Sequence, residues 1–312
     1  MNCARAAGLA ALLAARIAGS TAGIVADVRA ASDARNFSLA EREIQQYRTV
    51  RGVTPDAIEA LSWLARGLLD DKQYDRADAY ATETRQLSLD LLQRAGQAGV
   101  PVGDALGAAI EVHAQVLAAR GERAEAAAYL KTELASWAGT PIASRIQKNI
   151  NLLTLQGKPA PALDVGHWLG SRPPSLAALR GHPVLLFFWA HWCADCKAEV
   201  PILARLMDTY HQKGLILVGP TQLYGYTAAG EATPEAETAY IDRVRRQFYA
   251  PLGNMAVPLS AANFQKYGCS TTPTLVLLDR AGIVRLYHPG AMSYDALAAQ
   301  VRRFFAVKSS HS

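Results

Sequence analysis

The sequence predicts an all-α domain followed by an α/β domain with a central mixed sheet flanked by helices. Apolar residues keep a helical period in the first part and form short, nearly continuous runs in the second. The pattern changes at residues 155–165, "LQGKPAPALDV", where glycine and proline interrupt helix formation. The expected segments are a signal peptide over 1–26, a helical domain over 27–156 and the α/β domain over 157–308.

The composition is that of a globular protein. The chain has 312 residues, 50% of them hydrophobic, and a net charge of +5. Its basic residues are scattered and form no run interleaved with aromatics, so we expect no nucleic-acid partner. The four cysteines, Cys3, Cys193, Cys196 and Cys269, are too few for a disulfide scaffold in a chain this long. No cofactor is expected.

The N-terminus has the pattern of an export signal. Arg5 supplies positive charge, residues 6–15 form a short apolar core, and residues 20–22 offer small side chains for cleavage before Gly23. Arg16 splits the apolar stretch, so neither half approaches the roughly 20 apolar residues of a membrane-spanning helix. We expect export, with membrane anchoring disfavoured. An ordinary alanine-rich helix, a mis-assigned start and an organelle transit peptide are the alternatives.

Two segments of the helical part resemble each other at an offset of 49 residues. They are "LARGLLDDKQYDRADAYATET" from Leu64 and "HAQVLAARGERAEAAAYLKTE" from His113. Each is expected to be a helix, a polar turn and a second helix, with small residues where helices pack. This resembles the tetratricopeptide class of helical hairpin, although the offset exceeds the usual ~34 residues of that class. Another kind of helical bundle is the alternative. The helical domain is expected to pack against the α/β domain, and it is a candidate site for a protein partner.

The second part alternates between apolar runs of strand length and helical segments. Near-continuous hydrophobicity suits strands that are buried on both faces. The expected strands are 182–190, 215–220 and 272–279, and the expected helices are 198–212, 235–249 and 293–305. The stretch "DRAG" is a predicted turn that makes a hairpin with "IVRLYHP".

Two cysteines stand where the first of these strands meets the next helix. Cys193 at a helix N-terminus sees the positive end of the dipole, which lowers its pKa and makes it the candidate nucleophile. Cys196, one turn deeper, is the candidate resolving thiol. Lys197 adds positive charge nearby. Glu199 is a candidate proton acceptor for Cys196, or else a solvated surface carboxylate.

Two prolines add to this pattern. Pro201 lies inside the predicted helix and should kink it. Pro273 opens the third strand, and a proline at the mouth of a buried strand often has a cis peptide bond.

The stretches "FFWAHWCADCKAEVP" (187–201) and "YGCSTTPTLVLLDRAGIV" (267–284) resemble the thioredoxin superfamily, and more narrowly the TlpA/ResA group of exported thiol-disulfide oxidoreductases. The resemblance covers residues 157–306. It implies a thioredoxin-like fold, with Cys193 as the attacking thiol, Cys196 as the resolving thiol and Pro273 as a cis-proline beside them. The resemblance also implies a catalytic role for Glu199 and a role in substrate binding for Trp192 and Thr272.

The same resemblance sets the expected function and partners. Many members of the group reduce disulfides outside the cytoplasm. We therefore expect an extracytoplasmic, periplasmic thiol-disulfide oxidoreductase that reduces protein disulfides and is recharged by an upstream thiol donor. The helical half lies outside the resemblance.

Three features depart from the pattern of the family. Asp195 stands between the cysteines, where its charge opposes thiolate formation and should make the pair less oxidising. The segment 220–240 is longer than the minimal fold needs, and its residues 224–226 either shape a partner groove or belong to a plain insertion. Cys269, close to Pro273, is expected to be a small buried residue, with a third redox thiol as the alternative.

Three other classes of function remain as alternatives. A zinc site needs two close pairs of ligands, and the sequence has only one CxxC pair. His191 and Cys269 could act as further ligands only if the fold happened to bring them near that pair. A peroxiredoxin-type thiol peroxidase would need a Pro and a Thr before its nucleophile, and "FFWAHWC" has neither. A non-enzymatic protein that recruits a partner through its helical hairpins is the third.

Overall fold

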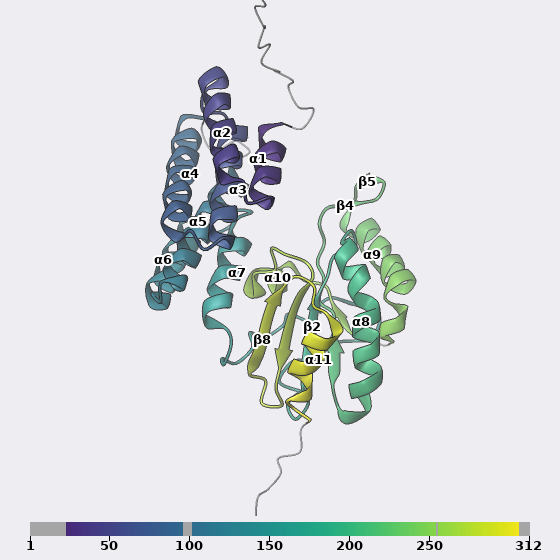
Figure 1. Ribbon diagram of the computed structural model, residues 1–312. Coiled ribbons are helices and arrows are strands. Elements are labelled where there is room, and N and C mark those ends of the chain that lie inside the picture. Colours follow the sequence, from purple (N-terminus) through teal and green to yellow (C-terminus); the bar gives the residue numbers. More distant parts are fainter. Residues whose placement is uncertain (1–22, 96–101, 254, 306–312) are drawn as a thin grey trace, which may run out of the picture.

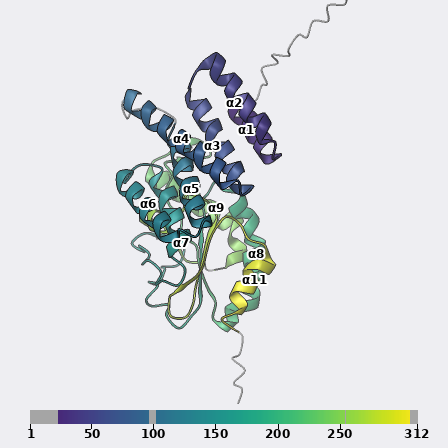
Figure 2. The same ribbon diagram turned by 60° about the vertical axis from the view of Figure 1, so that its left-hand side comes forward.

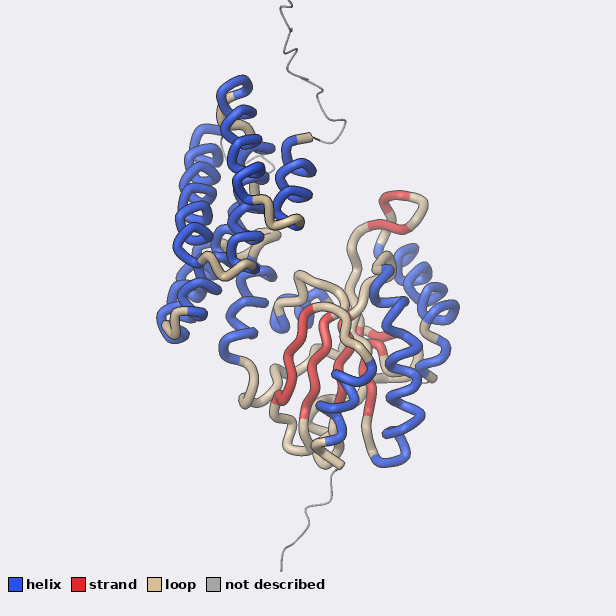
Figure 3. Tube along the Cα trace, in the orientation of Figure 1, coloured by secondary structure: helices blue, strands red, loops and turns tan. Residues whose placement is uncertain are grey.

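The computed structural model describes residues 23–95, 102–253 and 255–305 (Figure 1). Residues 1–22 of the predicted signal peptide, including Cys3, lie outside them. A helical part precedes a part that contains all the strands of the described chain (Figure 3). The helical part consists of α1 (Ile24–Asp33), α2 (Phe37–Arg51), α3 (Pro55–Asp70), α4 (Tyr74–Ala95), α5 (Gly103–Ala119), α6 (Arg123–Ser136) and α7 (Ala143–Thr154).

The two similar sequence segments lie in the hairpins α3–α4 and α5–α6. Their turns are equivalent, because Lys72 in the first and Gly121 in the second, 49 residues apart, both have positive φ, at 61° and 92°. Apolar residues of α3 such as Leu61 and Leu64 are buried in a cluster with Val112 of α5. The predicted helix–turn–helix segments are therefore confirmed as helical hairpins, and their assignment to the tetratricopeptide class stays a prediction.

The α/β part is built on a four-stranded sheet in the order β3-β2-β7-β8. β2 pairs with β3 in parallel and with β7 antiparallel, and β7 pairs antiparallel with β8, so the sheet is mixed as expected. The predicted strands are confirmed, and the "DRAG" turn joins β7 to β8 as predicted. The four strands are β2 (Val184–Phe188), β3 (Ile216–Val218), β7 (Thr274–Leu278) and β8 (Val284–Pro289).

Both faces of the two central strands are covered. All five residues of β2 and all five of β7 are buried, which explains why their sequences are apolar without alternation. Leu185 and Phe187 point into a cluster with the helices of one face, whereas Leu186 and Phe188 meet Tyr267 on the other. The covering helices are α8 (Ala194–Tyr210), α9 (Pro234–Phe248) and α11 (Tyr294–Arg302) on the first face and α10 (Ala261–Tyr267) on the second (Figure 1).

Shorter elements complete this part. The 3-10 turns η1 and η2 and two small two-stranded sheets, β1–β6 and β4–β5, lie around the central sheet. β4–β5 is a hairpin inside the predicted insertion. These elements are β1 (Trp168–Leu169), η1 (His211–Lys213), β4 (Tyr226–Thr227), β5 (Gly230–Glu231), η2 (Ala250–Leu252) and β6 (Val257–Pro258). In the described ranges, no helix combines the length and apolar character needed to cross a membrane.

Helix α7 joins the helical part to the α/β part. Figures 1 and 2 both place it on the side of the hairpins that meets the α/β part. Asn151 Nδ2 donates a hydrogen bond of 3.3 Å to the carbonyl oxygen of Lys266 at the end of α10. Gly268, which comes directly after α10 with φ +60°, lies so close to α7 that a Cβ there would be 2.7 Å from the carbonyl carbon of Gln147. Backbone meets backbone at this point, so only glycine fits.

Replacing Gly268 by alanine should destabilise the protein by more than its positive φ alone explains. Gly282 is the matched control, because it has φ +75° and a Cβ there would meet no atom of the described residues within 4 Å. Gly282→Ala should cost about 1–2 kcal/mol for the left-handed backbone. Gly268→Ala should cost about 1–3 kcal/mol more, because it forces α7 away. The free energy of unfolding in urea measures both, and equal losses would contradict the close approach of α7.

Candidate active site

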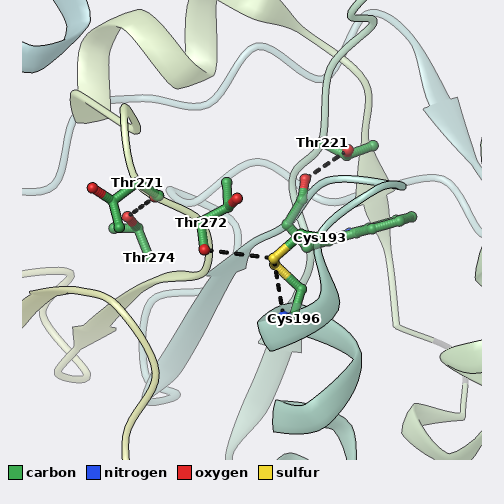
Figure 4. The surroundings of a disulfide bond; sticks show 7 residues. Cys193, Cys196, Thr221, Thr271, Thr272 and Thr274 are labelled. Atoms are coloured by element: carbon green, nitrogen blue, oxygen red, sulfur yellow. Dashed lines mark hydrogen bonds between the residues drawn. A yellow bond between two sulfur atoms is a disulfide. The ribbon is translucent and has the colours of Figure 1, made fainter. Parts of the chain in front are cut away.

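Cys193 and Cys196 form a disulfide at the start of α8, with their Cα atoms 5.3 Å apart (Figure 4). Cys193 is the N-cap of the helix, which begins at Ala194, as the sequence predicts. Both cysteines are buried, but unequally: Cys193 is 3% exposed and Cys196 is 0% exposed. Cys193 is therefore the sulfur that an incoming group can reach first.

The loop between β2 and α8 is fixed by buried polar contacts. The indole Nε1 of Trp189 donates to the carbonyl oxygen of Gly219 at 2.9 Å, and Thr221 Oγ1 donates to the carbonyl oxygen of Trp189 at 2.8 Å. Trp189 and Thr221 are completely buried. These bonds tie the segment that leads into Cys193 to the end of β3. Neither residue has a local sequence signal, because the partners are about 30 positions apart.

The sulfur of Cys193 faces two backbone groups. The N–H of Cys196 points at it over 3.0 Å, and the carbonyl oxygen of Thr272 lies 3.5 Å away (Figure 4). An N–H at the helix start favours a thiolate on Cys193 once the disulfide is reduced. The Thr272–Pro273 peptide bond is cis, as predicted. The structure thus brings Cys193, Cys196, Thr272 and Pro273 together.

The loop that carries Pro273 is held at both ends. Thr274 Oγ1 donates to the carbonyl oxygen of Thr271 at 2.7 Å, and the N–H of Gly290 donates to the carbonyl oxygen of Pro273 at 2.8 Å. Thr274 is the first residue of β7 and is completely buried. The position of Thr272 beside the sulfur is therefore set by the sheet and not by the loop alone.

Glu199 lies on the buried side of α8 and is 1% exposed. The alternative of a solvated surface carboxylate is therefore wrong, because the neighbouring elements cover this helix face. The N–H of Met292 donates to its two carboxylate oxygens at 3.2 and 3.3 Å. Burial raises the pKa of Glu199 above its ordinary value of 4.5, and the hydrogen bond from Met292 opposes this shift only in part. Pro201 lies inside the same helix.

The residues around the disulfide on its outer side are exposed. The indole of Trp192 is 48% exposed, and Asp195 is exposed in the first turn of α8. The ammonium group of Lys197, expected to add positive charge near the sulfurs, lies 4.6 Å from the ring centre of Phe248. Lys197 is thus engaged with an aromatic ring of α9.

His191, next to Trp192 in the chain and expected at most as a fortuitous metal ligand, lies against the acidic residue Glu237. Nε2 of His191 lies 3.2 Å from Oε1 of Glu237, without the geometry of a hydrogen bond. Both side chains are almost fully buried. Burial lowers the pKa of the His191 imidazole below its ordinary value, and the neighbouring Glu237 opposes this shift. The pairing has no local sequence signal, because Glu237 belongs to α9.

Cys269, the one described cysteine outside the disulfide, is buried as expected. Burial raises the pKa of its thiol well above the ordinary value, although a hydrogen bond with the Thr274 side chain opposes this. A buried thiol with a raised pKa is a poor nucleophile. Over the described ranges, no group of three or more His, Cys, Asp or Glu is placed to hold a metal ion.

Comparison with known proteins adds to this geometry. Residues 174–305 match the family model of the thioredoxin-like domain. The chain is 29% identical over 148 residues to the thiol:disulfide interchange protein DsbE of Pseudomonas fluorescens biotype C, covering 46% of this chain and 74% of that protein. It is 27% identical over 127 residues to the thiol-disulfide oxidoreductase ResA of Geobacillus thermodenitrificans, covering 41% and 66%.

A solved structure that is similar is the exposed lipoprotein thioredoxin of Streptococcus pneumoniae strain TIGR4. It is 22% identical and superimposes with a TM-score of 0.37 over 46% of this chain and 99% of that one. The family model covers the part of the chain that carries the Cys193–Cys196 pair. Residues 174–305 are therefore a thioredoxin-like domain, and the protein is related to the thiol-disulfide oxidoreductases.

Proposed function

We propose that the protein reduces disulfides of protein substrates outside the cytoplasm, with Cys193 and Cys196 as its working dithiol. One observation carries the proposal: the two sulfurs form a disulfide at the N-terminus of α8, and the more exposed one lies against the Thr272–Pro273 loop. This arrangement offers one thiol for attack and keeps the second ready to resolve the product.

The reaction proceeds by two exchanges. The Cys193 thiolate attacks one sulfur of the substrate disulfide, forms a mixed disulfide and releases the other substrate sulfur as a thiolate. Cys196 then loses its proton and attacks Sγ of Cys193, which releases the second substrate sulfur and closes the Cys193–Cys196 disulfide. Two electrons pass to the substrate, and an upstream thiol donor restores the dithiol.

Three further residues have proposed roles at this site. The exposed indole of Trp192 precedes Cys193 in the chain, and the backbone of Thr272 lies against the Cys193 sulfur, so both contact the bound substrate. Glu199 lies one helical turn beyond Cys196 and is the proposed acceptor of its proton. Its raised pKa supports this role, because a base works best when its pKa approaches the operating pH.

The reducing direction rests on Asp195. Its exposed carboxylate is in the first turn of α8, one residue before Cys196. A negative charge there disfavours the thiolate form of the reduced pair, which makes the dithiol give up its electrons more readily. The Cys196 N–H near the Cys193 sulfur acts in the opposite sense, so Asp195 moderates the effect of the helix.

Location and domain organisation are also part of the proposal. The pattern of residues 1–26 and the resemblance to exported oxidoreductases support a periplasmic location. A helical domain over 27–156 would supply a site for a protein partner, and the thioredoxin-like domain over 157–308 would supply the redox chemistry. The contact of α7 with α10 supports a function in which the two act together.

Cys196→Ser should trap substrates as mixed disulfides on Cys193, because the resolving thiol is absent. Cys193→Ser should abolish reduction of insulin disulfides, and Cys269→Ser, the control, should keep activity within about twofold because its thiol is buried. Insulin reduction assays and non-reducing gels measure these outcomes. Activity that survives Cys193→Ser would refute the proposal.

Two further measurements test the alternative functions. Peroxide turnover dependent on Cys193 would favour a thiol peroxidase, and stoichiometric zinc in the purified protein would favour a metal site.

Asp195→Asn should raise the reduction potential of the pair, because it removes a charge that disfavours the thiolate. An exposed charge in this position should shift the potential by about 5–20 mV. Equilibration with glutathione buffers measures the potential, and Asp208→Asn on the exposed side of the same helix is the control. A lower potential in Asp195→Asn would contradict the proposed role.

Glu199→Gln should slow the resolving step by on the order of 10²-fold, because a positioned proton acceptor is lost.

Glu199→Gln should also change the pH dependence of stability. Because the pKa of Glu199 is raised in the folded protein, ionising its carboxyl group lowers the free energy of unfolding. This loss of stability is absent below pH 4.5, the ordinary pKa of the group, and is complete once the pH exceeds the pKa in the folded protein. Glu199→Gln should therefore gain stability over the wild type between about pH 4 and pH 8. Urea unfolding at both pH values and the lifetime of the mixed disulfide test this, with Asp208→Asn as control. A wild-type resolving rate would exclude Glu199 as the proton acceptor.

A further inference from the structure

The carboxylate of Glu237 connects α9, the insertion and the active-site loop. Its two oxygens accept hydrogen bonds from the N–H groups of Tyr224 (2.6 Å) and Gly225 (2.8 Å), and Oε1 lies 3.2 Å from Nε2 of His191. The side chain is 1% exposed. Burying a carboxylate is costly unless polar groups satisfy it. Glu237 thus fixes the backbone at the point where the insertion turns away from β3.

Contacts between aromatic rings connect this group to Trp192, beside Cys193. The ring of His191 is packed edge-on by Tyr224, Tyr226 and Tyr240, at centroid distances of 5.5, 5.3 and 5.3 Å. The indole of Trp192, the residue before the attacking cysteine, stands edge-on against Tyr224 at 5.5 Å. The place of Trp192 is therefore set by Tyr224, and that of Tyr224 by Glu237.

Two of these aromatic side chains are open to solvent. Trp192 is 48% exposed, and Tyr226, on β4, is 39% exposed. Figures 1 and 3 show the β4–β5 hairpin projecting beyond the starts of α8 and α9, which is the end of the domain that carries Cys193. A shallow pocket of about 590 Å³, wide open to solvent, adjoins Tyr226 and is lined by Tyr224, Gly225, Tyr226, Glu231, Ala232 and Thr233.

We infer that Glu237 is a positioning residue, and that Trp192 and Tyr226, held through Tyr224, form an aromatic wall that binds the polypeptide segment beside the substrate disulfide. The inference rests on the proposed function and names how that function selects its substrate. We expect a polypeptide as the ligand, because the wall begins at Trp192, next to Cys193, and continues through Tyr224 to Tyr226 on the insertion. It therefore offers contacts to side chains beside the substrate disulfide as well as to its sulfur atoms. Exposed aromatic rings supply large contact areas for peptide side chains. The segment 220–240 then contributes a specific binding surface.

The test compares a protein disulfide with a small one. Reduced full-length protein is mixed with insulin or with hydroxyethyl disulfide, a non-aromatic compound too short to reach the wall, and single-turnover oxidation is followed over a range of concentrations. Glu237→Gln keeps the shape of the side chain but replaces one acceptor by a donor. Tyr226→Ala removes an exposed ring, including its edge-on contact with His191, but leaves the hydrogen bonds from Tyr224 and Gly225 to Glu237 in place. Glu235→Gln, on the exposed side of the first turn of α9, is the control.

For Glu237→Gln and Tyr226→Ala, the ratio of the insulin rate constant to that for hydroxyethyl disulfide should fall about tenfold, mainly through weaker insulin binding. Glu235→Gln should leave the ratio at its wild-type value. Equal loss on both substrates, or an unchanged ratio in Tyr226→Ala, overturns the inference, because it leaves Glu237 with a purely structural role. A wild type that reduces neither disulfide would instead refute the proposed function. Tyr226→Ala still decides the case if Glu237→Gln does not fold.

Discussion

The antiparallel pairing of β2 with β7 is the contact on which the site depends. Its register sets Phe188 opposite Thr274, and both strands are buried along their whole length. The residues that come after β2 and those that precede β7 therefore meet at one end of the sheet. Cys193 comes to lie 3.5 Å from the carbonyl oxygen of Thr272, although the two are far apart in the sequence. A slip of one residue would turn every side chain of the strand to the other face, which the buried core forbids.

The two sides of the disulfide differ in their exposure to solvent. Toward the protein interior, Cys196 is fully buried and the carboxylate of Glu199 is held out of water by the chain around Met292. Toward solvent, Trp192 and Asp195 are exposed. In the proposed function, the inner side holds the proton acceptor and the outer side contacts the substrate. This division arises because the cysteines are one helical turn apart at a helix start, where Cys193 lies slightly nearer the surface and Cys196 lies under it.

The helical part touches the α/β part close to the same loop. Gly268 meets α7 four residues before Thr272, and the hydroxyl of Tyr287 on β8 donates to the carbonyl oxygen of Tyr267 at 2.7 Å. The start of the Thr272–Pro273 loop is thus anchored on one side by the sheet and on the other by α7. The last helix of the helical part, α7, therefore supports a segment that ends beside the Cys193–Cys196 pair.

Local patterns were enough to predict the strands, the helices and the place of the cysteines. These patterns are continuous apolar runs of strand length, helical periodicity, and a spacing of three residues at a strand-to-helix junction. The position of Pro273 at the mouth of a strand could be predicted in the same way. The burial of Glu199, the meeting of His191 with Glu237 and the approach of α7 to Gly268 emerge only from tertiary contacts. Sequence spacing shows which face of a helix a residue occupies. The segments that cover that face come from elsewhere in the chain, and their contacts leave no local pattern to read.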